Sequence, residues 1–142
     1  MSMTPLHARH VAAGASFTTA YDQELPLTYG DDAAEYRAAR QGVALLDRAD
    51  AGALRLAGDT RIDFMQRQTT NDLKRLTPGQ ATITVLTNPQ ARIIDTLTLL
   101  ARDNDLLILN GPPRRDQLAA YLRGMVFFMD RVQVHDLNRD LQ

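Results

Sequence analysis

Hydrophobic residues recur with two different periods after residue 53, and the two periods predict two kinds of element. Alternation at every second position, as at Ile83 and Val85 between threonines, is typical of strands. Apolar residues spaced by three and four, as from Leu118 to Val126, indicate one face of a helix. We expect strands at 54–56, 80–87, 93–100, 106–109 and 132–134, and helices at 60–69 and 118–126.

Turn residues separate these elements and indicate the class of the fold. Asn88-Pro89-Gln90-Ala91, with proline at the favoured second position of a turn, predicts a hairpin, and Asp103-Asn104 predicts another. The order is then strand, helix, three strands, helix and strand. It predicts an α+β fold, with a ferredoxin-like layer of antiparallel sheet and two helices over residues 53–142. We expect most of the core from Ile62, Met65, Ile83, Val85, Ile94, Leu107, Leu118, Leu122 and Val134.

The first 52 residues form the other predicted region and show less periodicity. Asp32 and Glu35 have the spacing of a capping box, and Gly42 suits the end of a helix. Before them the chain is rich in turn residues and has little regular pattern. We therefore expect an irregular N-terminal arm over 1–30, a short helix over 33–41 and an apolar strand over 43–46.

Composition narrows the classes of function. The 142 residues are 44% hydrophobic and 23% charged, which suits one compact domain with an extension. The formal net charge is −1 and the basic residues are interleaved with acidic ones, so we expect no nucleic-acid partner. No apolar run is long enough to span a bilayer, and there is no cysteine for disulfide or thiolate chemistry. We therefore expect a cytoplasmic protein without a membrane partner.

Three groups of polar residues are candidates for chemistry. His7 and His10 are spaced so that they could share a metal ion, but two ligands are too few, and we assign no metal site. The polar cluster 69–72 is typical either of helix-end and turn hydrogen bonds or of a binding loop. Asp95 lies in an apolar run, where a carboxylate must be paired, protonated or on the solvated face of the sheet. If Ile94 points inward, simple alternation favours the solvated face.

Six segments together carry a family resemblance: TPLHARHVAAGASF (4–17), LPLTYGD (25–31), EYRAARQGVALLD (35–47), FMQRQTTNDLKRLTPGQ (64–80), LTNPQARIIDTLTLL (86–100) and LILNGPPRRDQLAAYL (107–122). They resemble the amino-terminal part of the glycine cleavage T-protein family, the aminomethyltransferases. The ARIID and FFMD details are more similar to the YgfZ-type folate-binding relatives of that family. The similarity extends over nearly the whole chain.

This resemblance implies tetrahydrofolate bound in a central funnel among three domains, in proteins substantially longer than this chain. In T-proteins the second acid of a Gly-Gly-Ile-Ile-Asp-Asp motif contacts the reacting folate nitrogen. Asp95 takes the place of the first acid and Thr96 that of the second. A tyrosine that packs on the folate falls on Ile83, and the cysteine signature of YgfZ-type proteins is absent. The resemblance thus implies a truncated module that is not catalytic alone, and we assign no catalytic residue.

Two functions stay open. The first is a folate-binding module of one-carbon metabolism or iron–sulfur protein maintenance, which positions tetrahydrofolate through polar side chains. The residues expected to do so are Asn71, Asn88, Arg92, Asp95 and Thr96. The second is a non-catalytic interaction or assembly domain that forms a homo-oligomer or completes a partner chain. In that case we expect the segment Leu25-Pro26-Leu27 to be the element exchanged between chains.

Overall fold

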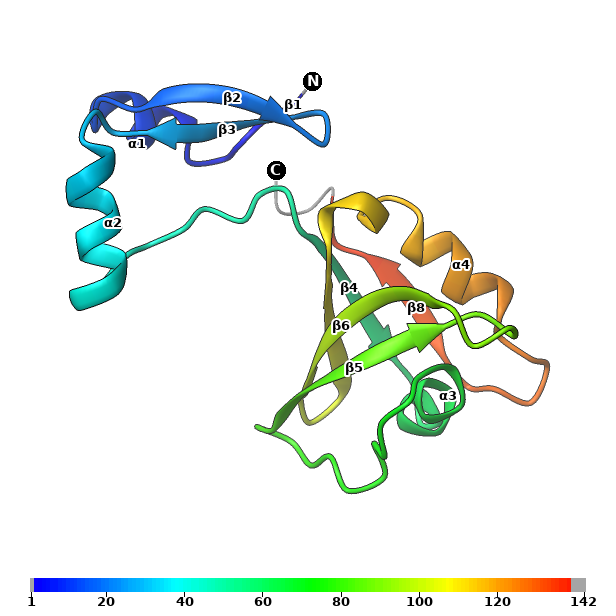
Figure 1. Ribbon diagram of the computed structural model, residues 1–142. Coiled ribbons are helices and arrows are strands. Elements are labelled where there is room, and N and C mark those ends of the chain that lie inside the picture. The colour runs from blue at the N-terminus through cyan, green and yellow to red at the C-terminus, as the bar shows by residue number, and fades with distance from the viewer. Residues whose placement is uncertain (1, 139–142) are drawn as a thin grey trace. The chain divides into compact units, whose positions relative to one another are not determined.

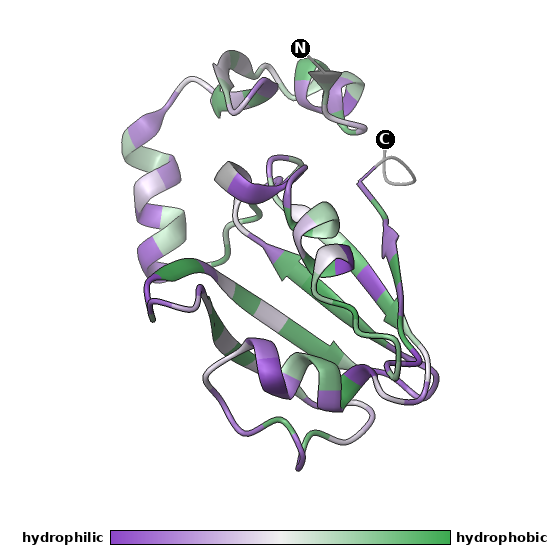
Figure 2. Cartoon of the chain, turned by 90° about the vertical axis from the view of Figure 1, so that its right-hand side faces the viewer, coloured by the Kyte–Doolittle hydropathy of each residue, from purple (hydrophilic) through white to green (hydrophobic). Residues whose placement is uncertain are grey.

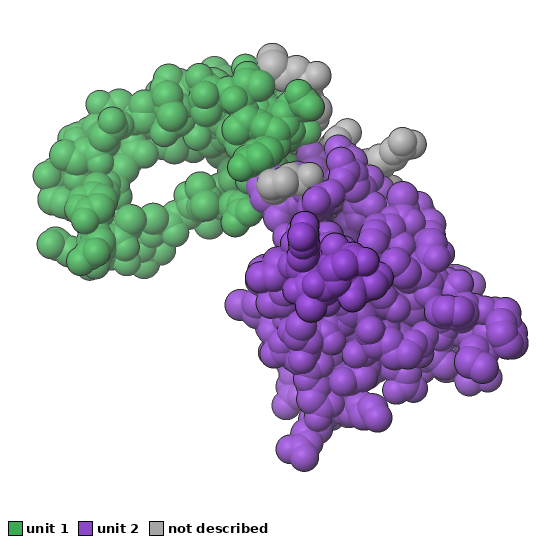
Figure 3. Space-filling model, turned by 45° about the vertical axis from the view of Figure 1, so that its right-hand side comes forward, with its two compact units in different colours: residues 1–50, 142 green, residues 51–141 purple. Residues whose placement is uncertain are grey.

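The computed structural model describes residues 2–138, and the chain divides into two compact units (Figure 3). Unit 1 ends at Asp50 and unit 2 begins at Ala51. The elements of unit 1 are β1 (Ser2–Met3), α1 (His7–Ala12), β2 (Ser16–Ala20), β3 (Gln23–Thr28) and α2 (Asp32–Gln41). Those of unit 2 are β4 (Gly52–Ala57), α3 (Arg61–Gln68), β5 (Ala81–Thr87), β6 (Ile93–Ala101), β7 (Asp105–Asn110), the 3-10 turn η1 (Pro112–Arg114), α4 (Leu118–Gly124) and β8 (Gln133–Asp136).

The predicted irregular arm is wrong, because residues 2–28 form a three-stranded sheet in the order β1-β3-β2 with helix α1 (Figure 1). Strands β2 and β3 are antiparallel and are joined by Tyr21 and Asp22, which both have positive φ angles (52° and 60°). Such a two-residue turn usually has the sequence Asn-Gly, so this hairpin has no strong sequence signal. Pro26 is tolerated in the middle strand because β1 pairs only with Gln23 and Glu24 and leaves that edge open at the proline.

Helix α2 agrees with the predicted helix, although its cap is one residue earlier than expected. The Asp31 carboxylate accepts a hydrogen bond from the Ala34 N–H at 2.9 Å, and the Glu35 carboxylate accepts one from the Tyr29 N–H at 2.7 Å. No residue of α2 is buried. The strand predicted at 43–46 does not form, since no described strand pairs with it, and Val43 and Leu45 are 92% and 97% exposed.

Unit 2 has the predicted order of elements and an α+β fold (Figure 1). Its five strands are antiparallel to their neighbours, in the order β5-β6-β7-β4-β8. Along the chain, a four-stranded ferredoxin-like fold has two strands between its two helices, whereas unit 2 has three. The additional strand is β5, which lies at an edge of the sheet. The hairpin predicted at 88–91 joins β5 to β6, and its ends are held by the hydrogen bond from Asn88 N to Arg92 O at 2.9 Å.

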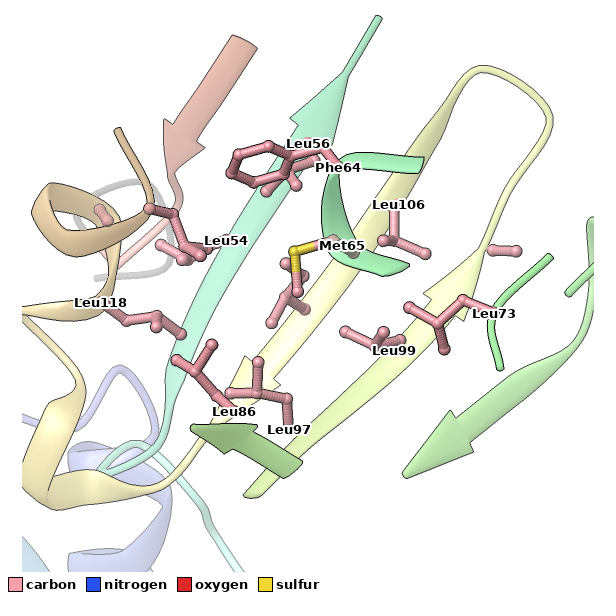
Figure 4. Close-up of a cluster of buried hydrophobic side chains, with 14 residues drawn as sticks. Leu54, Leu56, Phe64, Met65, Leu73, Leu86, Leu97, Leu99, Leu106 and Leu118 are labelled. Atoms are coloured by element: carbon pink, nitrogen blue, oxygen red, sulfur yellow. The ribbon is translucent and has the colours of Figure 1, made fainter. Parts of the chain in front are cut away.

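The core of unit 2 lies on one face of the sheet, where α3 and α4 supply side chains to the same cluster (Figure 4). Phe64, Met65 and Leu122 are fully buried and meet leucines of the strands. Figure 2 shows hydrophobic residues along the strands and many hydrophilic ones in the loops at their ends. The strand residues of the core are Leu54, Leu56, Leu86, Leu97, Leu99, Ala101, Leu106 and Ile108.

The predicted core is right for the helices and wrong for two strands. Met65, Leu118 and Leu122 are buried, while Ile62, Ile94 and Val134 are partly buried against the cluster. Ile83 is 62% exposed, and Val85 and Leu107 are half-buried on the same open face of the sheet. Both faces of β7 are apolar, and in β5 the more apolar face, with Ile83 and Val85, is the open one, so alternation alone did not indicate which face the helices would cover.

Candidate functional site

The turn between β5 and β6 is organised by Asn88, one of the predicted binding residues. Its Oδ1 accepts hydrogen bonds from the N–H groups of Gln90 (3.0 Å) and Arg92 (2.9 Å). Ala91 completes the turn with a φ of 59°. Asn88 therefore acts first as a turn residue, and it also lines a cavity.

Asn71 lies in the loop after α3 and attaches that loop to β5. Its Oδ1 accepts a hydrogen bond from the hydroxyl of Thr84 (3.1 Å), and its N–H donates to the same hydroxyl oxygen (3.2 Å). Thr84 is 1% exposed and lies on the covered face of the sheet beside the core leucines. The polar cluster 69–72 thus satisfies a buried hydroxyl, which is the structural alternative that its composition left open.

A β-bulge determines the orientation of Asp95. Leu86 pairs with Asp95 while Thr87 pairs with Ile93, so Ile94 is the extra residue on β6. Directly opposed residues share a face, and Leu86 is fully buried, so Asp95 lies on the covered face. The expectation that Asp95 faces solvent when Ile94 packs inward is therefore wrong, because alternation fails at the bulge.

Asp95 carries a polar atom that the described structure leaves unsatisfied. Its Oδ1 accepts a hydrogen bond from the N–H of Thr96 at 2.8 Å, whereas Oδ2 is buried and has no partner among the described residues. A buried carboxylate oxygen without a donor costs free energy unless a ligand or water supplies one. Thr96 pairs with Val85, is exposed, and lies on the opposite face.

Two cavities meet at Tyr121 near this end of the sheet. The larger, of about 230 Å³, is lined by Asn88 together with Arg67 and other residues of α3, the hairpin turn and α4. The smaller, of about 180 Å³, is lined by Ile94 and Arg114 among others. Asn71, Arg92, Asp95 and Thr96 line neither cavity. An aromatic ring, amides and guanidinium groups around such cavities suit a flat, polar ligand that carries negative charge.

Asp130 orders the loop between α4 and β8. Its Oδ2 accepts the N–H of Phe127 (2.9 Å), and its Oδ1 forms an ion pair with Nη2 of Arg67 (2.6 Å). The backbone hydrogen bond first, and the arginine second, hold the pKa of Asp130 below its usual range. Arg67, a residue of the larger cavity, is thereby fixed in position.

Unit 1 contains a hydrogen-bonded cluster that the sequence analysis missed. Nδ1 of His10 lies 2.6 Å from the Tyr29 hydroxyl, and Nε2 lies 2.9 Å from Oδ2 of Asp47. Thr4 donates its hydroxyl to the same Oδ2 (2.5 Å), and the Ala49 N–H donates to Oδ1 (3.0 Å). Burial raises the pKa of Asp47, but the hydrogen bonds from Thr4 and His10 outweigh it and hold that pKa below its usual range.

The His7–His10 pair does not form a metal site in the described structure. His7 stacks on Phe17 with ring centroids 4.6 Å apart, and its Nδ1 lies 3.2 Å from Oε2 of Glu24. His10 instead faces Asp47. Over residues 2–138 we find no group of three or more His, Asp or Glu side chains that could hold a metal ion. Within the same range, every helix is too short or too polar to cross a membrane.

Comparison with known proteins gives consistent matches. Residues 6–142 match the GCVT N-terminal domain family. The chain is 34% identical over 113 residues to an aminomethyltransferase of Desulforamulus reducens, covering 78% of this chain and 31% of the relative. It is 39% identical over 95 residues to an aminomethyltransferase of Picosynechococcus, covering 67% of this chain and 26% of the relative. This chain thus spans about a third of the length of these curated relatives or less.

A solved structure shows the same fold. The crystal structure of glycine cleavage system aminomethyltransferase T from Bartonella henselae matches with a TM-score of 0.83 and 23% sequence identity. The match covers 96% of this chain and 38% of that protein. Both units of this chain therefore have counterparts in an aminomethyltransferase fold.

Proposed function

This chain belongs to the GCVT N-terminal domain family, and from that membership we propose that it binds a reduced folate, tetrahydrofolate, in one-carbon chemistry. The observation that carries the proposal is Oδ2 of Asp95, which is buried and has no hydrogen-bond donor among the described residues. The reduced pterin ring of tetrahydrofolate offers N–H donors. An N–H placed at Oδ2 would satisfy this atom and remove the cost of leaving it unpaired.

The neighbouring residues support a ligand of this kind. Ile94, which precedes Asp95, lines the smaller cavity, and Tyr121 joins it to the larger one. Asn88 offers an amide, and Arg114 offers positive charge for the carboxylates of a folate, whereas Arg67 is already paired with Asp130. In this proposal Asn71 and Arg92 support the loop and the turn rather than contact the ligand.

We propose binding without turnover by this chain alone. A carboxylate beside the reacting nitrogen orients it and stabilises the positive charge that develops during transfer. Thr96, at the position of the acid that does so in T-proteins, has a neutral hydroxyl and lies on the open face. Asp95 is a carboxylate on the covered face, so it can accept a hydrogen bond from a ligand nitrogen. It is, however, a single acid at a place where the T-protein motif has two.

A thermal-shift titration with tetrahydrofolate tests this proposal. A ligand that binds only the folded chain raises its stability, by about 2.7 kcal/mol at a hundredfold excess over Kd. We expect a rise in Tm of roughly 5 °C or more under that condition. The Asp95→Asn variant should lose most of this rise, whereas Asp103→Asn, in the exposed turn before β7, should keep it. An unchanged Tm for the natural chain would refute folate binding.

A specific observation also favours the second function, an interaction or assembly domain. The open face of the unit 2 sheet carries Ile83 (62% exposed) and Leu109 (44% exposed), with Thr98 between them on three adjacent strands. Val85, Leu100 and Leu107 extend this apolar face. Contiguous apolar patches on soluble proteins usually mark contact surfaces, so we propose that this face binds another copy or a partner chain.

The oligomeric state tests the second function directly. Light scattering after size exclusion should show a mass above that of the monomer, and Ile83→Ser with Leu109→Ser should return the chain to a monomer. The control is the double variant Thr82→Ser with Thr87→Ser, which changes two other residues of β5. It should keep the mass of the oligomer. If the chain is a monomer at high concentration, binding of another copy is refuted, and only binding of a different partner chain is still consistent with the proposal.

A further inference from the structure

A cavity of about 480 Å³ lies within unit 1, separate from the residues discussed for folate. Its walls include the apolar side chains of Leu6, Leu45 and Leu46. The Tyr29–His10–Asp47 cluster lies at the same cavity. The volume is within the range of small-molecule sites, about 300–1,000 Å³.

The polar groups of the cavity leave its carboxylate already satisfied. Asp47 accepts hydrogen bonds from Thr4, His10 and the Ala49 N–H, and its side chain is 9% exposed. These three donors occupy acceptor positions of the carboxylate, so Asp47 is already satisfied as a hydrogen-bond acceptor. It orients the imidazole of His10, as a carboxylate does in a hydrogen-bonded chain.

The protons on the His10 ring determine whether the Tyr29 hydroxyl at the cavity donates its own proton to His10. When Nε2 donates to Asp47, Nδ1 of the neutral ring accepts the proton of the Tyr29 hydroxyl. When the ring is protonated, both nitrogens donate, and the Tyr29 proton can turn to a ligand. Tyr29 is 41% exposed, so a ligand can reach its oxygen.

Two guanidinium groups determine the sign of the ligand charge. Arg9 and Arg48 both line the cavity. Arg48 uses Nε for Asp50 at 3.0 Å, and its guanidinium group has further N–H donors on the two terminal nitrogens. The lining thus holds two guanidinium groups and one carboxylate, that of Asp47, and offers net positive charge beside leucine side chains. Arginine binds carboxylates in a bidentate manner.

We propose that this cavity binds a small organic anion composed of an apolar body and one carboxylate. The leucines pack against the body, and Arg9 and Arg48 bind the carboxylate. Tyr29 donates a hydrogen bond to the carboxylate in the arrangement in which both nitrogens of His10 are donors. The proposal concerns unit 1 only and does not depend on folate binding by unit 2.

Benzoate and its neutral isostere benzamide are the probes, followed by ¹H–¹⁵N NMR titration of the full chain. We expect saturable shifts from benzoate at residues 6–10, 29 and 45–48, and binding of benzamide that is weaker by about tenfold, as for the loss of one charge-assisted interaction. Because this comparison uses only the natural chain, it does not depend on the folding of any variant. Equal binding of the two probes, or no saturable shift from benzoate, would overturn the proposal.

Variants then assign the groups. Arg9→Gln and Tyr29→Phe should each weaken benzoate binding by about fivefold to tenfold, and Arg40→Gln, an exposed arginine of α2 outside the cavity, should not change it. Asp95→Asn should leave benzoate binding unchanged, which separates this site from the folate proposal. Unchanged affinity in Arg9→Gln and Tyr29→Phe would place benzoate elsewhere and refute the assignment.

Discussion

Nε2 of His10 lies 2.9 Å from Oδ2 of Asp47, which is 37 residues further along the chain. This contact joins helix α1 to the segment that follows α2, and Thr4 adds a second hydrogen bond to the same oxygen. α2 has no buried residue, so these polar contacts help to hold the segment after α2 against the rest of unit 1.

The Asp47→Asn substitution should therefore destabilise unit 1. Asparagine has only one acceptor oxygen, so it cannot take the place of both Oδ2, which accepts from Thr4 and His10, and Oδ1, which accepts from the Ala49 N–H. One side loses its acceptor and faces the amide NH₂ instead, and we expect a loss of about 1–3 kcal/mol. Hydrogen exchange of the amides in β2 and β3 measures this local stability. Asp22→Asn, which changes an exposed carboxylate in a turn, is the control and should have little effect. Equal exchange rates in the two variants would contradict the prediction.

The stability of unit 1 should depend on pH through the same carboxylate. The pKa of Asp47 is lowered in the folded state, so its contribution is present above the unfolded pKa and is lost as pH falls through the folded pKa. The contribution of Asp47 to the free energy of unfolding of unit 1 should therefore be constant from neutral pH to about pH 4 and decrease below it. The Tyr29 ring signals in NMR report this locally. In the Asp47→Asn variant, which lacks this carboxylate, the change of the Tyr29 signals with falling pH should be smaller.

Leu122→Ala should cost about 2–5 kcal/mol in the free energy of unfolding, because Leu122 is fully buried between α4 and the sheet. Ile83→Ala removes a similar volume from an open face and should cost less than about 1 kcal/mol. Denaturant unfolding of both variants tests which face of the sheet holds the core. A larger cost at Ile83 in the monomer would reverse the assignment.

Gly58→Ala should destabilise unit 2 by about 2–3 kcal/mol. Gly58 has a φ of +107°, and an added Cβ would meet the carbonyl oxygen of Arg131. Gly124→Ala provides the contrast, since nothing lies within 4 Å and the residue is helical. That substitution should stabilise the chain by about 0.5 kcal/mol, because it lowers the entropy of the unfolded state. Thermal unfolding of the two variants measures both changes in stability, the loss at Gly58 and the gain at Gly124.

Thr96→Asp should not produce aminomethyl transfer. The new carboxylate would lie on the open face, opposite Val85, while Asp95 lies on the covered face, so the two acids would not act on one ligand atom. Folate-dependent release of ammonia from an aminomethylated donor measures the activity. Release by the unmodified 142 residues or by Thr96→Asp would show that the proposed division between binding and turnover is wrong.

Local sequence determined the order of the elements in unit 2. Proline and asparagine at 88–91 encode a turn, and the spacing from Leu118 to Leu122 encodes a buried helix face, because both signals act between residues close in the chain. The hairpin at Tyr21 and Asp22 has a two-residue turn with positive φ angles but lacks the usual Asn-Gly, so its sequence did not indicate it.

Tertiary structure decided what depends on residues far apart. Ile83 and Leu86 are equally suited to a core, and only the packing of α3 and α4 on one face buried Leu86 and left Ile83 exposed. The bulge at Ile94 turned Asp95 to the covered side, although alternation predicted the reverse. The sequence pointed His10 toward His7, whereas His10 meets Asp47 because the chain folds back over 37 residues. Spacing along a chain encodes local geometry, whereas which surfaces are buried and which polar groups meet is settled by long-range packing.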